Sequence, residues 1–318
     1  MFADAASTSP LYVQLARAIA RDPELLALSG AVRHPPVANV LLAAVHARLL
    51  SGDAHPLRAF YPSCGGADRG DPYHAFRDFC LTRAEVLQPV LERRITQTNE
   101  VGRCLVIVPG LLQVPGTLAL IELGSSAGLH LFCDRYHYRW GPHVLGWSES
   151  PVQLTAEFSG GPLDLPGLPP LVYRVGVDQN PLDLADDADR LWLRALVWPE
   201  HEARRASLEA AMALTDGGPP DVRRGDALAS LDALMTEAPP GASRVVLHSH
   251  TWNQFTPAYR SALEAALTRH APCWRLAFEH VGGPTSELWL HTYTASGVSR
   301  RKLAEADPHG AWVRWLGS

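Results

Sequence analysis

The sequence lacks the features that mark membrane and secreted proteins. The longest uncharged run, Leu105–Ile121, is broken by two Pro-Gly pairs, whereas a membrane-spanning helix needs about 20 continuous apolar residues. Met1–Pro10 shows no basic segment followed by an apolar one, so the sequence predicts no secretory signal. We therefore expect a cytoplasmic protein without a membrane partner, in which residues 105–121 form a helix, a loop and a buried strand.

Cysteine is scarce and basic runs are absent. The five cysteines are odd in number, widely spaced and free of C-x-x-C pairs, which argues against a disulfide framework or a zinc cluster. We expect reduced thiols, mostly in the core, and no metal site. Lys and Arg number 28 against 33 Asp and Glu and are scattered, so no nucleic-acid partner is expected. A small-molecule substrate is favoured, and nothing in the sequence indicates the oligomeric state.

The first third of the chain has helical periodicity. The chain is 318 residues long with 47% hydrophobic content, enough for one large domain or two of ordinary size. Apolar residues within Val37–Leu49 repeat at three and four. Asp22-Pro23-Glu24 is typical of a helix start, and Thr82 with Glu85 predicts a capping box. These patterns predict an α-helical cap domain over residues 1–98.

From about residue 99 the pattern changes to short apolar runs alternating with helical segments, which is typical of a mostly parallel sheet in an α/β domain spanning residues 99–318. The predicted parallel strands are Leu118–Leu123, Val172–Val177, Val222–Arg224, Val245–His248 and Arg275–Val281. The predicted helices are Leu129–Tyr136, Asp187–Val197, Pro199–Leu214, Leu228–Glu237 and Pro257–His270. Three segments joined by short turns predict an antiparallel end to the sheet: Leu288–Thr294, Val298–Leu303 and Trp312–Leu316.

A long insertion, residues 140–170, separates the first two predicted strands. It is rich in Gly and Pro, yet Val152, Leu154, Ala156 and Phe158 alternate with polar neighbours. The alternation predicts either a hairpin or a lid over the site.

The clearest motif is Glu122-Leu123-Gly124-Ser125-Ser126-Ala127-Gly128, between a predicted strand and a predicted helix. Small residues let the backbone turn sharply and approach a ligand, and a helix start offers free N–H groups. The motif admits three interpretations, which make different demands on the rest of the chain.

Two of these interpretations are weak. Dinucleotide binding needs G-x-G-x-x-G, but counting from Gly124 places Ser126 and Leu129 where glycines belong. A serine hydrolase needs G-x-S-x-G, which is present with Ser126 as the nucleophile. The helical upstream region supplies no oxyanion loop, and Asp226 with His248 or His280 would have to complete the triad. The hydrolase remains an alternative.

The third interpretation is an S-adenosylmethionine-binding loop. Glu122, Gly124 and Gly128 match an acid followed by alternate glycines, with the small Ser125 and Ser126 between them. Later strands end in suitable acceptors. Asp178-Gln179-Asn180 closes the second strand, where a carboxylate accepts from ribose hydroxyls, and Asp226-Ala227 follows the third, where a carboxylate accepts from the adenine amino group.

Longer segments add a family resemblance. These segments are Thr98–Arg103, Glu122–Leu129, Asp134–Tyr136 with Tyr138 and Trp140-Gly141, Val177–Pro181 and Trp192–Pro199. On them the chain resembles, over nearly its whole length, a bacterial family known as domain of unknown function 2332. The resemblance implies a Rossmann-like class I methyltransferase three-layer sandwich, with a mostly parallel sheet and antiparallel C-terminal strands behind an N-terminal helical cap. The sequence departs from the wider methyltransferase pattern at Ser126, in the long insertion, and between Val281 and Leu288, where no helix fits.

Asn99, Glu100 and Arg103 lie at a predicted helix start. Asn99 as a cap and Glu100 with Arg103 as an exposed ion pair is one interpretation. The family resemblance favours another, in which all three border the cofactor loop and reach the methionine end of the ligand.

His248 and His250 end the fourth predicted strand, and strand alternation would place both side chains on one face. No third ligand with metal spacing accompanies them. Methyl transfer depends mainly on alignment, and a base is needed only when the acceptor must lose a proton. Either histidine is a candidate base, and His248 is also a candidate cofactor contact. The sequence thus predicts an S-adenosylmethionine-dependent methyltransferase of a small molecule; a serine hydrolase and a non-catalytic nucleoside-binding protein are the alternatives.

Overall fold

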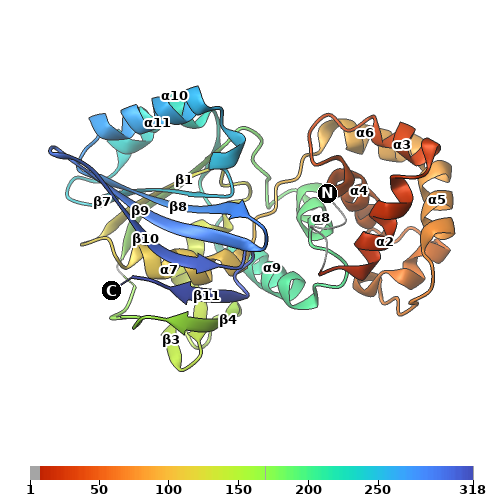
Figure 1. Ribbon diagram of the computed structural model, residues 1–318, viewed down its shortest axis with the longest axis horizontal. Helices are drawn as coiled ribbons and strands as arrows, with labels where there is room; N and C mark the ends of the chain where they lie inside the picture. The colour runs from red at the N-terminus through yellow and green to blue at the C-terminus, as the bar shows by residue number, and fades with distance from the viewer. Residues whose placement is uncertain (1–7, 169, 318) are drawn as a thin grey trace. The chain divides into compact units, whose positions relative to one another are not determined.

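The computed structural model describes residues 8–168 and 170–317 and divides the chain into two compact units (Figure 1). The helical unit runs to Thr98 and also includes Ala185–Ala206, and the sheet unit contains Asn99–Leu184 and Ser207 onwards. Residues 185–206 lie within the range predicted for the α/β domain, yet they group with the helical unit. No helix in the described part of the chain is both long and apolar enough to cross a membrane.

The helical unit is built from short helices whose starts follow local sequence rules. Asp22 caps α3 by accepting from the N–H groups of Glu24 and Leu25, as its position before Pro23 predicts. The helices are α2 (Pro10–Ile19), α3 (Pro23–Ser29), α4 (Val37–Leu50), α5 (Tyr73–Thr82), α6 (Ala84–Arg93) and α8 (Asp187–Leu196), with 3₁₀ turns η1 (Pro56–Phe60) and η2 (Pro62–Cys64).

Buried hydrogen bonds explain why α8 belongs to the helical unit. Nδ1 of His46, on α4, lies 3.0 Å from the carbonyl oxygen of Ala195, and Trp192 donates from Nε1 to the carbonyl of Ile95. His46 and Trp192 are almost completely buried. Since α4 also packs along α8, the later segment completes the core of the earlier helices.

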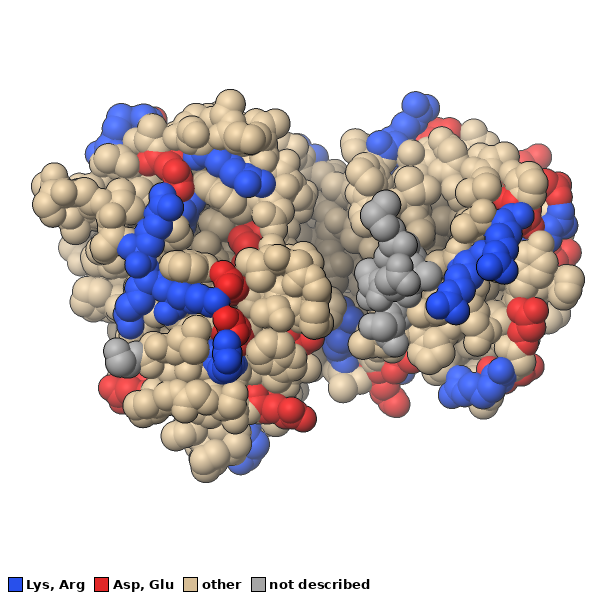
Figure 2. Space-filling model, viewed as in Figure 1, with Lys and Arg blue, Asp and Glu red and all other residues tan. Residues whose placement is uncertain are grey.

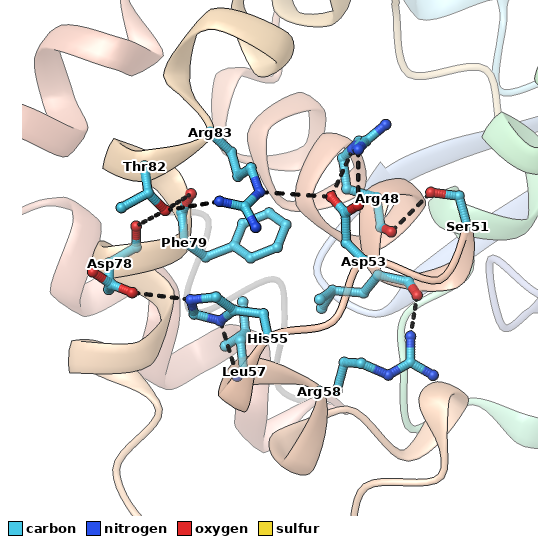
Figure 3. Close-up of polar contacts among 11 residues, drawn as sticks. Arg48, Ser51, Asp53, His55, Leu57, Arg58, Asp78, Phe79, Thr82 and Arg83 are labelled. Carbon is cyan, nitrogen blue, oxygen red and sulfur yellow. Dashed lines mark hydrogen bonds and ion pairs between the residues drawn. The ribbon is translucent and has the colours of Figure 1, made fainter.

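A polar cluster joins the end of α4 to α5 (Figure 3). Asp53 accepts from two nitrogens of Arg48 and lies 4.0 Å from Arg83. Nδ1 of His55 accepts from the Leu57 N–H, so Nε2 carries the proton that faces Asp78 at 3.0 Å. The predicted capping box at Thr82 does not form, because Thr82 ends α5 and its hydroxyl donates back to the Asp78 carbonyl.

The sheet unit is an α/β fold around one large mixed sheet. Among the described residues, eleven strands are hydrogen-bonded in the order β3-β2-β4-β11-β10-β9-β8-β7-β1-β5-β6. Their bounds are β1 (Leu118–Leu123), β2 (His137–Trp140), β3 (His143–Gly146), β4 (Gln153–Gly160), β5 (Leu171–Asp178), β6 (Val222–Arg224), β7 (Ser243–Ser249), β8 (Cys273–Gly282), β9 (Thr285–Thr294), β10 (Gly297–Ala306) and β11 (Trp312–Trp315).

Strand β1 is the centre of the parallel part. All six of its residues are buried, and it pairs in parallel with β5 on one side and β7 on the other. Strands β6 and β8 extend this part outwards, also in parallel. A strand covered on both faces has a mostly apolar sequence, as Leu118–Leu123 does, and this pattern predicted the strand.

Helices cover both faces of the sheet (Figure 1). On one face α10 (Ala227–Glu237) and α11 (Pro257–Arg269) pack on a core that includes Ile121, Val175 and Val246. On the other face α7 (Cys104–Leu111) contacts β8, β9, β10 and β4. The remaining helix, α9 (Glu202–Leu214), carries the chain from the helical unit back into the sheet unit.

The antiparallel C-terminal end is confirmed: β9 pairs with β8 and β10, and β10 pairs with β11. The insertion forms strands, since β2 and β3 make a hairpin and β4 runs parallel to both β2 and β11. Val152, Leu154 and Ala156 are buried, as the alternation predicts. The insertion thus extends the sheet at the edge opposite β6.

The cysteines are free thiols, as expected, and four of the five are buried. Burial raises the pKa of Cys273 to about 11, so this thiol is protonated near neutral pH. Charged side chains of both signs are interspersed over the sheet unit (Figure 2), in keeping with the pairing of Lys302 with Glu287 and Glu305.

Candidate functional site

The loop after β1 is held in a tight, left-handed conformation. Gly124 has φ +72°, Ser126 φ +54° and Gly128 φ +74°. A Cβ at Gly124 would overlap the side chain of Thr251, and one at Gly128 would approach Val222. Ser126 is a non-glycine residue in a region that costs L-residues about 1–2 kcal/mol. The loop therefore needs glycine at both ends and tolerates the small Ser126 between them.

The loop amides are largely used within the protein. Gly124 donates to the carbonyl of Val177 at 2.8 Å, Ser126 donates to Oδ2 of Asp178 at 2.9 Å, and Leu129 donates to Oδ1 of Asn99 at 2.7 Å. The segment after the loop is a 3₁₀ helix, η4 (Leu129–Arg135), with a kink at Phe132. The predicted helix is therefore present in 3₁₀ form, but the prediction of free N–H groups at its start is wrong for Leu129, whose amide binds Asn99.

Asp178, Gln179 and Asn180 lie together at the end of β5. Asp178 accepts from Ser126 through Oδ2 and from the Asn180 N–H through Oδ1 at 2.8 Å. Its carboxylate thus joins the end of β5 to the loop after β1. Gln179 is exposed, and its Nε2 lies 3.5 Å from Oδ2 of Asp226.

Asp226 caps α10, because Oδ1 accepts from the Ala229 N–H at 2.9 Å. Burial raises the pKa of this carboxyl, but hydrogen bonds from Ala229, Tyr259 and other donors hold it below its ordinary value. Ala227 is buried at the first position of the helix. Asp226 and Asp178 are therefore brought to the same edge of the sheet, with Gln179 between them.

Glu122 forms a buried pair that the sequence analysis missed. Oε1 of Glu122 lies 2.7 Å from Nδ1 of His130, and Nε2 of His130 lies 2.9 Å from the carbonyl of Glu100. Both side chains are at most 2% exposed. Both ring nitrogens of His130 thus face protein oxygens. Oε2 of Glu122 has no partner among the described residues.

Asn99, Glu100 and Arg103 are buried beside this pair, so the interpretation of Glu100 and Arg103 as an exposed ion pair was wrong. Asn99 binds the start of η4, and Glu100 caps the 3₁₀ turn η3 (Val101–Arg103) and lies 3.3 Å from Nδ1 of His309. Arg103 donates to Ser249, at the end of β7, and to the carbonyl of Pro308. The structure thus brings these three residues, Glu122 and the end of β7 together.

His248 and His250 lie on opposite faces of the sheet, which corrects the predicted shared face. Nδ1 of His248 lies 2.7 Å from Oε1 of Glu279, on β8. His250 follows the end of β7 with φ +56°, which breaks the alternation, and its ring lies against Phe278 and His280, on the other face of β8.

Burial lowers the pKa of both histidines. For His250, burial together with the nearby Arg103 and His309 lowers the pKa to about 2. His248 is 1% exposed; its pKa is lowered by burial, against a raising effect of Glu279. Nε2 of His248 has no partner in the described chain, whereas Nε2 of His250 lies 3.1 Å from Oγ of Ser286. Of these two histidines, His248 is the one oriented by a carboxylate and able to act as a base through Nε2.

Glu279 is a second residue that the sequence analysis missed. It accepts through Oε1 from His248 and from the backbone N–H groups of Thr251 and Trp252. Burial raises the pKa of Glu279, but these donors together lower it by more, so the net shift is downwards. Alternation along β8 places Glu279 on the same face of the sheet as Arg275 and Ala277, and could have been read from the sequence. Its pairing with His248 depends on the register between β7 and β8, which the sequence does not give.

Comparisons with known proteins bear on the family alone. A search of curated proteins gives no match. A family model described as "Uncharacterized protein conserved in bacteria", domain of unknown function 2332, matches residues 2–315. The match covers almost the whole sequence, in keeping with the resemblance noted above, and the chain belongs to this bacterial family.

Proposed function

We propose that this protein is an S-adenosylmethionine-dependent methyltransferase with a Rossmann-like class I sheet unit, acting on a small molecule. The observation that carries the proposal is the bond between Asp178, at the end of β5, and Ser126, in the loop after β1. In open α/β sheets, ligands bind at the carboxyl ends of strands where the winding reverses. Here β1 lies between β5 and β7, so the loop and Asp178 are at such a point.

The residues at this edge fit the cofactor's chemistry. Asp178 is partly exposed, and a carboxylate at a strand end is a suitable acceptor for ribose hydroxyls. Asp226, next to Ala227 and with Gln179 near it, is the acceptor assigned to the adenine amino group, and Asn180 is assigned to the cofactor beside Asp178. Oε2 of Glu122, which has no partner among the described residues, suits a cationic group of the ligand. We assign Glu122 to the methionine end of the cofactor, together with Gly124, Ser125, Gly128, Asn99, Glu100 and Arg103.

When bound, S-adenosylmethionine supplies an electrophilic methyl group. The chain's own part is to align the acceptor and, where the acceptor must lose a proton, to take that proton. His248 suits this role because Glu279 fixes its Nδ1 edge and leaves Nε2 without a protein partner in the described chain. His250, with a pKa of about 2, is a much weaker base, so we assign the role to His248.

Calorimetry with S-adenosylmethionine and S-adenosylhomocysteine tests the proposal. We expect both to bind the wild-type protein and Asp178→Ala to weaken binding about tenfold or more, since ribose hydrogen bonds to a carboxylate contribute about 1.5–3 kcal/mol. Asp164→Ala, at an exposed position in the insertion, is the matched control and should bind as wild type. No heat with either compound, or an unchanged affinity in Asp178→Ala, would refute the proposal.

The two alternatives have distinct signatures. The hydrolase requires a triad, but His248 pairs with Glu279, and Asp226 caps α10. Labelling of Ser126 by a fluorophosphonate probe would nevertheless favour a hydrolase. Cofactor binding without turnover across a broad acceptor panel would favour a non-catalytic nucleoside-binding protein.

A further inference from the structure

A cavity of about 320 Å³ lies on the α11 face of the sheet. It is formed over β7, β8 and β9, where alternate residues of β8 face the same side. The lining residues that matter for its chemistry are His248, Trp252, Arg275, Glu279, Val281 and Trp289. Its volume falls within the range typical of small-molecule sites.

Three side chains that line this cavity have buried polar atoms without a partner among the described residues. They are Nε and one terminal nitrogen of Arg275, Nε2 of His248 and Oε2 of Glu279. Arg275 is 4% exposed and His248 is 1% exposed. A buried donor or acceptor without a partner destabilises the protein, because it has lost its hydrogen bonds to water. A ligand that supplied the missing partners would remove that destabilisation.

The unpartnered atoms have different requirements. Arg275 can only donate, so its free nitrogens need an acceptor. Glu279 accepts three hydrogen bonds through Oε1 and is ionised, so the proton between it and His248 belongs to Nδ1 of the histidine. Nε2 of His248 and Oε2 of Glu279 therefore need donors. The complementary ligand carries an acceptor at one end and an O–H or N–H donor at the other.

The aromatic lining sets the size and shape of the ligand. The His248 ring stacks on Trp252 with centroids 4.8 Å apart, and the Arg275 guanidinium lies 4.3 Å from the centroid of the same indole. Because both polar groups lie against one ring, a ligand that reaches both is compact. Trp289, Val281 and Ala277 supply further apolar lining, which favours a flat ring between the two polar ends.

The unpartnered nitrogens of the buried Arg275 guanidinium favour an acid over a neutral acceptor. One terminal nitrogen of Arg275 binds Glu264 at 3.0 Å, but its Nε and other terminal nitrogen are left over. A hydrogen bond from a guanidinium to a carboxylate is charge-assisted and stronger than one to a neutral acceptor. Glu287, also in the lining, is already neutralised by Lys302.

We propose that this cavity binds a compact planar organic acid that carries a hydroxyl or amino group opposite its carboxylate. Arg275 holds the carboxylate, and His248 with Glu279 accepts from the hydroxyl or amine. That the bound molecule is the methyl acceptor rests on the proposed function, because the donor atom then lies at the base. The binding itself does not depend on the cofactor.

Binding is tested without cofactor by calorimetry and by tryptophan fluorescence, using para-hydroxybenzoate and para-aminobenzoate as probes. Benzoate, which lacks the donor, and phenol, which lacks the acid, are the matched comparisons. We expect at least one of the two probes to bind about tenfold or more tightly than both comparisons, as one satisfied buried hydrogen bond predicts. Equal affinities for all four compounds, or no binding at millimolar concentration, would overturn the proposal.

Variants locate the site. Arg275→Gln and His248→Gln should each weaken binding of the favoured probe about tenfold, while Arg269→Gln, an exposed arginine of α11, should not. Wild-type affinity in both variants would overturn the proposed placement. If a variant fails to fold, the ratio of the affinities of the probe and of benzoate for the wild-type protein still tests the proposal. Failure here with intact Asp178-dependent cofactor binding would refute the pocket and leave the methyltransferase proposal standing.

Discussion

Nδ1 of His248 lies 2.7 Å from Oε1 of Glu279, while Nε2 of the same ring has no partner among the described residues, and the residue lines a cavity. One edge of the imidazole is thus fixed by a carboxylate, and the other is left for a ligand. A histidine held in this way has a defined tautomer and a defined direction for accepting a proton.

Replacing Glu279 should change the pKa of the proposed base, His248. Glu279→Gln removes the charge that raises the pKa of His248, so the acidic limb of the pH–rate profile should move to lower pH. For an acceptor that must lose a proton, kcat should fall about 10²-fold, the lower end of general-base contributions. Profiles of wild type, Glu279→Gln and the exposed control Glu149→Gln measure this. An unshifted limb in Glu279→Gln would contradict the assignment of His248.

Gly124 should tolerate no side chain. Gly124→Ala places a Cβ against Thr251 at a left-handed φ, so we expect a loss of about 2 kcal/mol or more in the free energy of unfolding. Gly217→Ala is the matched control because nothing lies within 4 Å of its added Cβ. Denaturant unfolding of both variants measures the difference. Equal stabilities would show that the loop relaxes around the methyl group.

The buried Glu122–His130 pair should show strong coupling. Removing one partner leaves the other buried, which typically costs about 3–5 kcal/mol, whereas an exposed pair contributes at most about 1 kcal/mol. A double-mutant cycle with Glu122→Gln and His130→Gln should give a coupling energy well above that of the exposed Arg269–Asp232 pair. Coupling no larger than that of the surface pair would mean that the buried pair is not ionic.

His46 should make the helical unit acid-sensitive. Burial lowers its pKa from 6.5 to about 4, so between these values the unfolded state binds a proton that the folded state excludes. Stability contributed by neutral His46 is therefore complete above pH 6.5 and decreases as pH falls, by about 3 kcal/mol at pH 4. Thermal unfolding against pH should show a shallower slope for His46→Gln than for wild type. The exposed control His34→Gln should keep the wild-type slope.

Patterns of neighbouring residues were enough to predict the parallel strands and much of the loop after β1. The run Leu118–Leu123 is apolar because it is covered on both faces, and the glycines at 124 and 128 are needed for positive φ. The position of Asp178 near the loop was predictable because it ends a parallel strand next to β1. Such features depend on a few consecutive residues, so a sequence pattern contains them.

Features that depend on distant partners were missed. Oδ1 of Asn99 accepts from the Leu129 N–H across 30 positions in the sequence, at the start of the predicted helix, which is a 3₁₀ helix. The parallel pairing of β4 with β11 joins segments about 150 residues apart. His250 leaves the predicted face because one residue takes a left-handed φ. No spacing rule links Arg275 to His248, because strand register and side-chain reach bring them together.

Residues 185–206 have a consequence for biosynthesis. The ribosome delivers α8 only after β1 to β5 of the sheet unit, yet α8 contributes Trp192 and the carbonyl of Ala195 to the core of the helical unit. Domains usually fold in the order in which they emerge. We therefore expect the N-terminal helices to lack part of their core until Ala206 has been synthesised, and nascent chains of intermediate length to expose apolar surface that chaperones bind.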